Sequence, residues 1–337
     1  MRRGSILQLL GLGVLFGAAA TVVALLVPWL PPNASKERDG IDLVFWFTTA
    51  ICIGVGALVF AVITYSILHF RARPDDDSDG PPIHGNTGVE IVWTAVPAIL
   101  VTAISVISGI VLVQNDRADA HALNVNVTAR QFAWTFEYPG KGHITAAQLR
   151  LPLGRSVVLH LTALDVIHSF WVPEFGQKQD ALPGQDTKLV ITPTKIGNYP
   201  VICTELCGLG HAVMRTRAIV MQPAAFNTWL KKEREAGNLP PGQAGKAVFD
   251  ANGCAACHTL QAAGAQGKVG PDLDKLPDYA KQAGKPLEDF IRESIVDPNA
   301  YVQPGFPKGV MPPFSTLPKD QLDSLVQYLV ESSKGAK

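Results

Sequence analysis

Four side chains in one short stretch of the sequence could together bind a soft metal ion. Residues 203–214 contain two thiols, one imidazole and one thioether, on Cys203, Cys207, His211 and Met214. This set of ligands favours copper above the other common metals. A mononuclear blue-copper site uses one thiolate, so the second cysteine indicates two bridging sulfurs and two copper ions that share one electron.

A dinuclear copper site needs a second imidazole, which must come from elsewhere in the chain. We expect it to be His168, because this residue follows a β-like stretch and precedes an aromatic segment that ends at Pro173. We interpret three other histidines as structural: His121, His143 and His160. A disulfide between the two cysteines and a zinc site remain the alternatives to copper.

A second pair of cysteines has the spacing of a haem attachment site. In Cys254-Ala255-Ala256-Cys257-His258, two thiols can bind one haem covalently and the imidazole can bind its iron. A redox dithiol or half of a zinc site is the alternative, but residues 240–337 contain no second cysteine pair. The same residues contain one methionine, Met311, and no second histidine, so we expect Met311 to be the other iron ligand. Such a haem has a raised potential and is suited to electron transfer.

The elements that must position these residues begin with an apolar N-terminal part. Three runs without a charged residue, 4–35, 43–69 and 91–115, are each long enough to cross a bilayer. The first also resembles a signal peptide, because small residues at 18–20 follow an apolar stretch. Basic residues at 2–3 and 71–73 predict that these ends face the cytoplasm, so everything after about residue 116 faces outside. Haem can be attached covalently in that oxidising compartment.

The rest of the chain changes pattern twice. Short alternating stretches at 124–128, 156–162 and 188–192 predict an antiparallel β-sandwich or barrel that ends near Val220. A helix over 224–236 and a Pro-rich break follow, and helix-like stretches at 244–252, 287–296 and 319–331 predict a small all-α domain. With 29 basic and 29 acidic residues, the chain has no charge excess that would indicate nucleic-acid binding.

The fold class is therefore a multi-domain membrane protein with a helical hairpin, an all-β domain and an all-α domain. The expected units are a signal peptide or extra membrane helix (1–35), a membrane hairpin (41–115), a β-domain (116–222), a linker helix with a Pro-rich linker (223–242) and an all-α haem domain (243–337).

From about residue 41, the chain resembles subunit II of haem-copper cytochrome c oxidases. Three features carry the resemblance: the segment from Cys203 to Met214, His168 in its own loop, and the two helices that precede the β-domain. The added haem domain is similar to that of the fused subunit II of caa-type oxidases. The resemblance implies a cupredoxin-like domain with a dinuclear CuA centre, bridged by Cys203 and Cys207 and bound by His168 and His211. It implies weak axial ligation by Met214 and by the carbonyl of Glu205, whose side chain would also reach a magnesium ion at the border with subunit I.

The resemblance also assigns roles to three residues outside the metal sites. Glu90 matches a carboxylate at the cytoplasmic mouth of a proton channel into subunit I, and an ordinary interfacial charge at a helix start is the alternative. Phe132 and Trp134 lie in the aromatic region tied to electron uptake from a soluble cytochrome c. The family usually has Trp directly after Gln131, so Phe132 is a departure that puts the usual docking route in doubt.

The implied function is electron transfer in a respiratory oxidase of the bacterial plasma membrane, coupled to proton translocation. Electrons would pass from an external donor to the haem, then to CuA, then to the haem of subunit I, where oxygen is reduced. The implied partners are subunits I and III, membrane lipid, and a c-type cytochrome or a quinol–cytochrome c reductase complex as donor. The alternatives are a copper–haem protein related to nitrous-oxide or nitric-oxide reductases, and a membrane-anchored copper-delivery protein.

Overall fold

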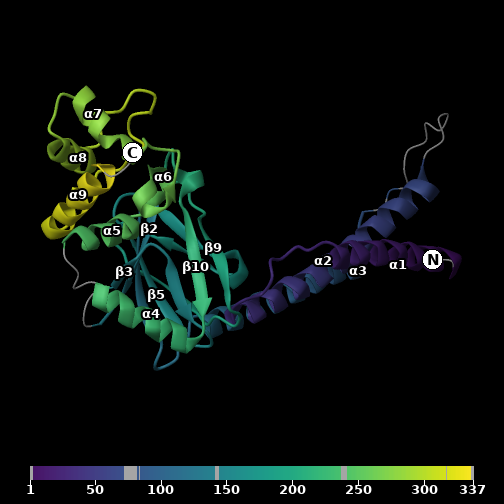
Figure 1. The fold of residues 1–337 in the computed structure, drawn as a ribbon. Helices are drawn as coiled ribbons and strands as arrows, with labels where there is room; N and C mark the ends of the chain where they lie inside the picture. The colour runs from purple at the N-terminus through teal and green to yellow at the C-terminus, as the bar shows by residue number, and fades with distance from the viewer. Residues whose placement is uncertain are drawn as a thin grey trace. The chain divides into compact units, whose positions relative to one another are not determined.

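The computed structural model describes residues 3–71, 82, 84–140, 144–236, 241–315 and 317–334 (Figure 1). It divides into two compact units, one formed by Met1–Pro32 with Asp39–Asn115 and the other by Asn33–Arg38 with Asp116–Lys337. His143 and the basic residues 2 and 73 lie outside the described residues.

Three long apolar helices form the first unit. They are α1 (Arg3–Leu26), α2 (Glu37–Phe70) and α3 (Thr87–Asn115), and each is long and apolar enough to cross a membrane. Within the unit, the Phe16 and Phe60 rings lie 5.8 Å apart, so α1 packs against α2. Gly40 of α2 is so close to Val111 of α3 that a Cβ there would lie 2.9 Å from a valine methyl group. Most other apolar side chains of these helices are exposed, as expected for surfaces that meet lipid or other subunits.

Two five-stranded sheets form the part that we call the β-domain. Their strand orders are β3-β2-β1-β5-β8 and β4-β10-β9-β6-β7. The strands are β1 (Leu123–Arg130), β2 (Ala133–Tyr138), β3 (Ile144–Ala146), β4 (Leu149–Pro152), β5 (Val157–Ala163), β6 (His168–Trp171), β7 (Lys178–Ala181), β8 (Thr187–Ile191), β9 (Gly197–Cys203) and β10 (Arg215–Met221). Alternate residues of β1 and β5 point into one shared core, which fits their alternating sequences.

The prediction that this domain is antiparallel is wrong for two strand pairs. Strand β1 pairs in parallel with β5, and β4 pairs in parallel with β10. Parallel neighbours need a crossover rather than a hairpin, and β2, β3 and β4 lie between β1 and β5 in the chain. The alternating pattern shows which face a residue occupies, but it carries no information on the direction of the neighbouring strand.

A segment that follows α1 and includes the first residues of α2 also belongs to the β-domain. The backbone N–H of Ala34 donates to the Glu174 carbonyl over 2.9 Å, and that of Lys36 donates to the Thr192 carbonyl over 3.0 Å. Arg38 is 2% exposed, and its Nη1 donates to the Pro173 carbonyl over 2.6 Å. The β-domain is therefore held by residues 33–38 as well as by the chain that follows residue 115.

The remaining helices are α4 (Pro223–Ala236), α5 (Pro241–Ala251), α6 (Cys254–Cys257), α7 (Leu276–Gln282), α8 (Leu287–Val296) and α9 (Lys319–Lys334). Helix α4 packs on the β-domain, because the Trp229 ring lies 5.0 Å from that of Tyr138. Helices α5 to α9 form what we call the α-domain, with β11 (Thr259–Leu260) and β12 (Ala265–Gln266). A Cβ at Gly245 of α5 would overlap the Ser324 carbonyl of α9, so these two helices pack closely. The sequence pattern missed the short helix α7, which has proline at its second position.

Candidate metal centre

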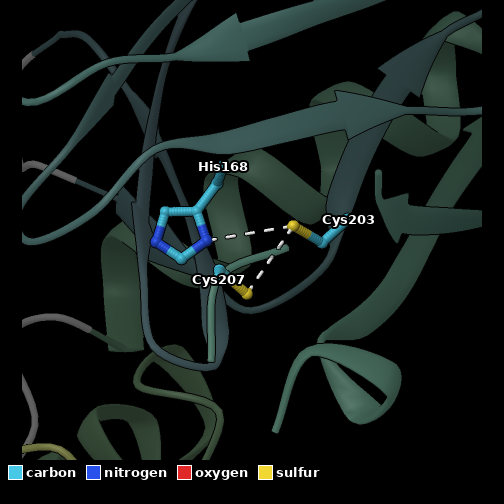
Figure 2. Close-up of side chains that lie close together, drawn as sticks. All are labelled: His168, Cys203 and Cys207. Carbon is cyan, nitrogen blue, oxygen red and sulfur yellow. Dashed lines mark hydrogen bonds between the residues drawn. The ribbon is translucent and has the colours of Figure 1, made fainter. Parts of the chain in front are cut away.

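The sequence-predicted copper ligands come together at one end of the β-domain. His168 begins β6 and Cys203 ends the adjacent strand β9, where it pairs with Phe170. Cys207 lies in the loop that leads to β10. Figure 2 shows His168, Cys203 and Cys207 around one point, and their ligand atoms all lie within 4.8 Å of one another. Antiparallel pairing of β9 with β6 and β10 therefore brings residues from two distant segments to one place.

Each thiol has its own imidazole. The Sγ atom of Cys203 lies 3.9 Å from His168 Nδ1, and that of Cys207 lies 3.5 Å from His211 Nδ1. The two sulfurs are 3.9 Å apart, so the cysteines are free thiols and not a disulfide. Two weaker donors complete the set. The Met214 Sδ atom lies 3.8 Å from Cys207 Sγ, and the Glu205 carbonyl oxygen lies 3.3 Å from Cys203 Sγ.

This arrangement fits a pair of copper ions. His168 and Met214 are fully buried, and Cys203 and Cys207 are only 3% and 2% exposed. Buried sulfur and nitrogen donors that face one another without stronger partners are suited to a soft metal. The Glu205 carbonyl faces the Cys203 sulfur, whereas the Glu205 side chain is exposed at the surface.

Asp165 orients His168, although no sequence motif singles it out. His168 Nε2 lies 2.9 Å from Asp165 Oδ1, which leaves Nδ1 facing the sulfurs. The other oxygen of the carboxylate accepts a hydrogen bond of 2.7 Å from the Gln131 backbone N–H. A carboxylate behind a ligating histidine sets the tautomer and the ring orientation. Its position three residues before His168 is a signal that sequence reasoning could have used.

The two thiols differ in how readily they ionise. Burial opposes ionisation of Cys203, but hydrogen bonds with His168 and with backbone groups of Ser169 and Glu205 bring its pKa down to about 7. Burial and the adjacent Cys203 sulfur raise the pKa of Cys207 to about 12. Without a cation, one thiolate therefore forms near neutral pH and the second does not, because adjacent negative charges repel each other. Metal binding is expected to release protons from this site.

The predicted haem residues surround an apolar cavity of the α-domain. Cys254 and Cys257 lie on α6, His258 follows them, and all three line the cavity together with Met311. The Nδ1 atom of His258 lies 2.8 Å from the Pro271 carbonyl oxygen, which leaves Nε2 to bind iron. Burial lowers the pKa of His258 and keeps the imidazole in its neutral, metal-binding form. The apolar lining, with His258 and Met311 both facing the cavity, fits a c-type haem.

The aromatic region lies between the two candidate sites. The Trp134 ring, 2% exposed, makes an edge contact with the His168 ring at 6.2 Å. Phe132 packs against residues 204–214 between β9 and β10, which hold most of the predicted copper ligands and which we call the copper-ligand loop, because a Cβ at Gly210 would overlap its ring. Phe132 also lines the haem cavity.

Glu90 takes part in the first turn of α3. The backbone N–H of Asn86 donates to Glu90 Oε1 over 3.0 Å, and the N–H of Val89 donates to Asn86 Oδ1 over 3.2 Å. These two bonds satisfy N–H groups that a helix start leaves unpaired. This geometry matches the alternative interpretation of Glu90, a charge at a helix start.

Three segments of the chain match family models of known proteins. The description "Cytochrome C oxidase subunit II, transmembrane domain" matches residues 21–110, and "Cytochrome C oxidase subunit II, periplasmic domain" matches residues 144–222. The description "Cytochrome c" matches residues 242–333. The solved periplasmic domain of subunit II of cytochrome oxidase from Bradyrhizobium japonicum is 27% identical, with a TM-score of 0.33, and covers 36% of this chain and 97% of that one.

Two curated relatives are both named cytochrome c oxidase subunit 2. The protein of Alkalihalophilus pseudofirmus is 30% identical over 290 residues, which cover 82% of this chain and 82% of that one. The protein of Synechocystis is 32% identical over 272 residues, which cover 64% of this chain and 80% of that one. The paired thiols and imidazoles, the helices of membrane-spanning length and these matches agree: the chain belongs to the cytochrome c oxidase subunit 2 family and carries a cytochrome c domain.

Proposed function

We propose that this chain takes up electrons for a membrane haem-copper oxidase. Cys254, Cys257, His258 and Met311 would hold a haem that takes electrons from a c-type cytochrome or a quinol–cytochrome c reductase complex. The β-domain ligands would hold a dinuclear copper centre that carries them on to the haem of subunit I. Oxygen reduction belongs to subunit I. One observation carries the proposal: two free, buried thiols 3.9 Å apart, each beside its own imidazole.

The β-domain residues have separate tasks in this proposal. Cys203 and Cys207 would supply the thiolates shared by the two coppers, His168 and His211 would each hold one copper, and Met214 and the Glu205 carbonyl would be weaker ligands. The copper pair supplies a single-electron carrier in which the electron is shared. The chain contributes a buried, hydrogen-bonded ligand set that excludes water, so little has to rearrange when the electron arrives. A copper-delivery role is disfavoured, because its thiols should be exposed, whereas these are 3% and 2% exposed.

The surroundings of the subunit belong to the same proposal. Helices α2 and α3 form the membrane hairpin, and α1 is either a third membrane helix or a removed signal. The β-domain and α-domain face outward from the bacterial plasma membrane, and subunits I and III are the neighbours in the membrane. The carboxylate of Glu205 is exposed and would help to hold a magnesium ion at the border with subunit I.

The order of electron transfer can be tested by rapid reduction of the whole oxidase complex. A reduced c-type cytochrome is mixed with the oxidised enzyme, and the haem c band and the near-infrared copper band are followed in time. We expect the haem c band to change first and the copper band afterwards. Copper that is reduced before haem c would contradict the proposed order.

Asp165→Asn is expected to weaken copper binding by roughly 10- to 100-fold, the usual effect of losing a partner of a ligating histidine. The amide cannot accept from both His168 and the Gln131 N–H, whereas the carboxylate does. Copper retention is measured against a series of competing chelator concentrations. Asp186→Asn is the matched control, because Asp186 Oδ2 lies 3.5 Å from His160 in another histidine–aspartate pair away from the metal ligands. Equal copper retention in the two variants would refute the orienting role of Asp165.

Glu90→Gln is expected to reduce turnover by up to roughly 100-fold, the usual loss when a proton-transfer group is removed. Glutamine keeps an oxygen that can accept from the Asn86 N–H, so the start of α3 should persist. Glu90→Ala removes both functions and serves as the comparison. Turnover and proton release are measured on the purified complex. If Glu90→Gln keeps normal turnover and only Glu90→Ala impairs assembly, Glu90 acts at the helix start alone.

A further inference from the structure

The haem cavity is not lined by the α-domain alone. Three of its lining residues belong to the β-domain: Gln131 and Phe132 form the turn between β1 and β2, and Ala133 is the first residue of β2. They face the same cavity as Cys254, Cys257 and Met311. Both domains lie in one compact unit of the structure. The β1–β2 turn is therefore a part of the haem site that the sequence motif does not contain.

Arg130, the last residue of β1, holds two segments of the α-domain at once. Its Nη2 donates a hydrogen bond to Asn252 Oδ1, and its guanidinium carbon lies 4.3 Å from the centre of the Phe314 ring. Asn252 comes two residues before Cys254, and Phe314 comes three residues after Met311. One side chain thus contacts the segments that carry the haem attachment site and the second predicted iron ligand.

Both residues that Arg130 contacts are themselves held by hydrogen bonds. The Asn252 side chain is itself held, because its Nδ2 donates to the Val248 carbonyl over 2.7 Å. The Phe314 N–H donates to the Ile295 carbonyl over 2.9 Å. Arg130 is only 9% exposed, so its cation is largely removed from water and depends on these two partners. A desolvated guanidinium over an aromatic ring is more stabilising than the same contact in water.

Two smaller contacts continue this interface along β2. The Thr135 hydroxyl donates to the Ala251 carbonyl over 3.2 Å. Gly253 has a φ of +69°, and a Cβ there would lie 2.9 Å from the Ala133 methyl group. Glycine at this position therefore meets two needs, the left-handed backbone and the close approach of the β-domain.

The other side of the same turn contacts the copper-ligand residues. The Gln131 side-chain amide donates to the Cys207 carbonyl, and its backbone N–H donates to Asp165, the partner of His168. The Phe132 ring lies against Gly208 and Gly210. The turn is thus in contact with the haem cavity on one side and with the backbone of a copper ligand on the other.

We propose that Arg130 is a positioning residue that docks the α-domain on the β1–β2 turn, so that its haem cavity opens towards the copper-ligand loop. The inference rests on the proposed function and adds an interaction surface whose partner is the chain's own haem domain. Because Phe132 is only 8% exposed in this arrangement, an outside donor has little access to it. The docked α-domain covers this residue.

The test uses the whole oxidised oxidase complex and the Arg130→Ala variant. Pulsed electron paramagnetic resonance gives the distribution of distances between the copper centre and the haem c iron, and photoreduction gives the rate of electron transfer between them. We expect a narrow distribution in the unchanged enzyme, and in Arg130→Ala a broad one with a rate at least tenfold lower. Arg217→Ala, an exposed arginine on β10, is the control and should behave like the unchanged enzyme.

Phe314→Leu removes the aromatic partner of Arg130 and so tests the same contact from the α-domain. It also serves as the test if the Arg130→Ala variant does not assemble. It should broaden the distribution too, and the double variant should be no slower than Arg130→Ala, because both changes remove one contact. A narrow distribution in both single variants, or losses that add in the double variant, would overturn the docking role. An unchanged enzyme without a two-copper signal or haem c would instead overturn the proposed function on which the inference rests.

Discussion

Cys207→Ser should abolish the two-copper signal and reduce oxidase turnover by at least about 100-fold, more than the loss of an outer partner of a metal ligand usually causes. Cys207 is the residue that joins the two halves of the site. Its sulfur lies 3.9 Å from Cys203 Sγ, 3.5 Å from His211 Nδ1 and 3.8 Å from Met214 Sδ. A serine hydroxyl is a hard, protonated donor and cannot bridge two soft ions. The magnetic resonance signal and the metal content of the complex measure the loss.

Cys52→Ser is the matched control for this substitution. Cys52 is an exposed free cysteine on α2, outside the β-domain. The control should keep the full copper content and normal turnover. If Cys207→Ser keeps the signal of two coppers sharing one electron, the bridging assignment is wrong. If neither the variant nor the unchanged enzyme binds copper in the β-domain, the proposed function fails as a whole.

Met311→Leu should convert the haem of the α-domain into a poor electron carrier. Met311 lines the haem cavity together with His258, and leucine has nearly the same volume, so the fold should be kept. The thioether ligand raises the haem potential, and its loss should lower the potential by about 0.1 V or more within the roughly 0.8 V that axial ligands span. Electron transfer onward to copper would then run uphill. A potentiometric titration followed at the haem c band measures the change.

Met221→Leu is the matched control, since Met221 ends β10 and packs on the core of the β-domain. Its haem potential and turnover should be those of the unchanged enzyme. An unchanged haem potential in Met311→Leu would exclude this methionine as an iron ligand. That result would not bear on the separate prediction that haem is attached covalently at Cys254 and Cys257.

The sequence alone was enough to predict both candidate metal sites. The compact segments Cys203 to Met214 and Cys254 to His258 indicate their chemistry through residue type and spacing, which need no knowledge of the fold. Membrane-spanning length is likewise a property of composition, and the charge-free runs all lie within or overlap the helices α1, α2 and α3. The stretch 287–296 could be read as a helix from its pattern, and α8 has those bounds.

Only the tertiary structure decided which distant residues meet. It pairs β1 in parallel with β5, adds residues 33–38 to the β-domain and sets Asp165 behind His168. It also brings Arg130 to Asn252, across a separation of 122 residues. Periodicity reports which side of an element is buried, because that depends on local geometry. The neighbour on that side depends on the path of the whole chain, so a lone arginine at the end of a strand has no local signature that distinguishes a docking residue from a surface charge.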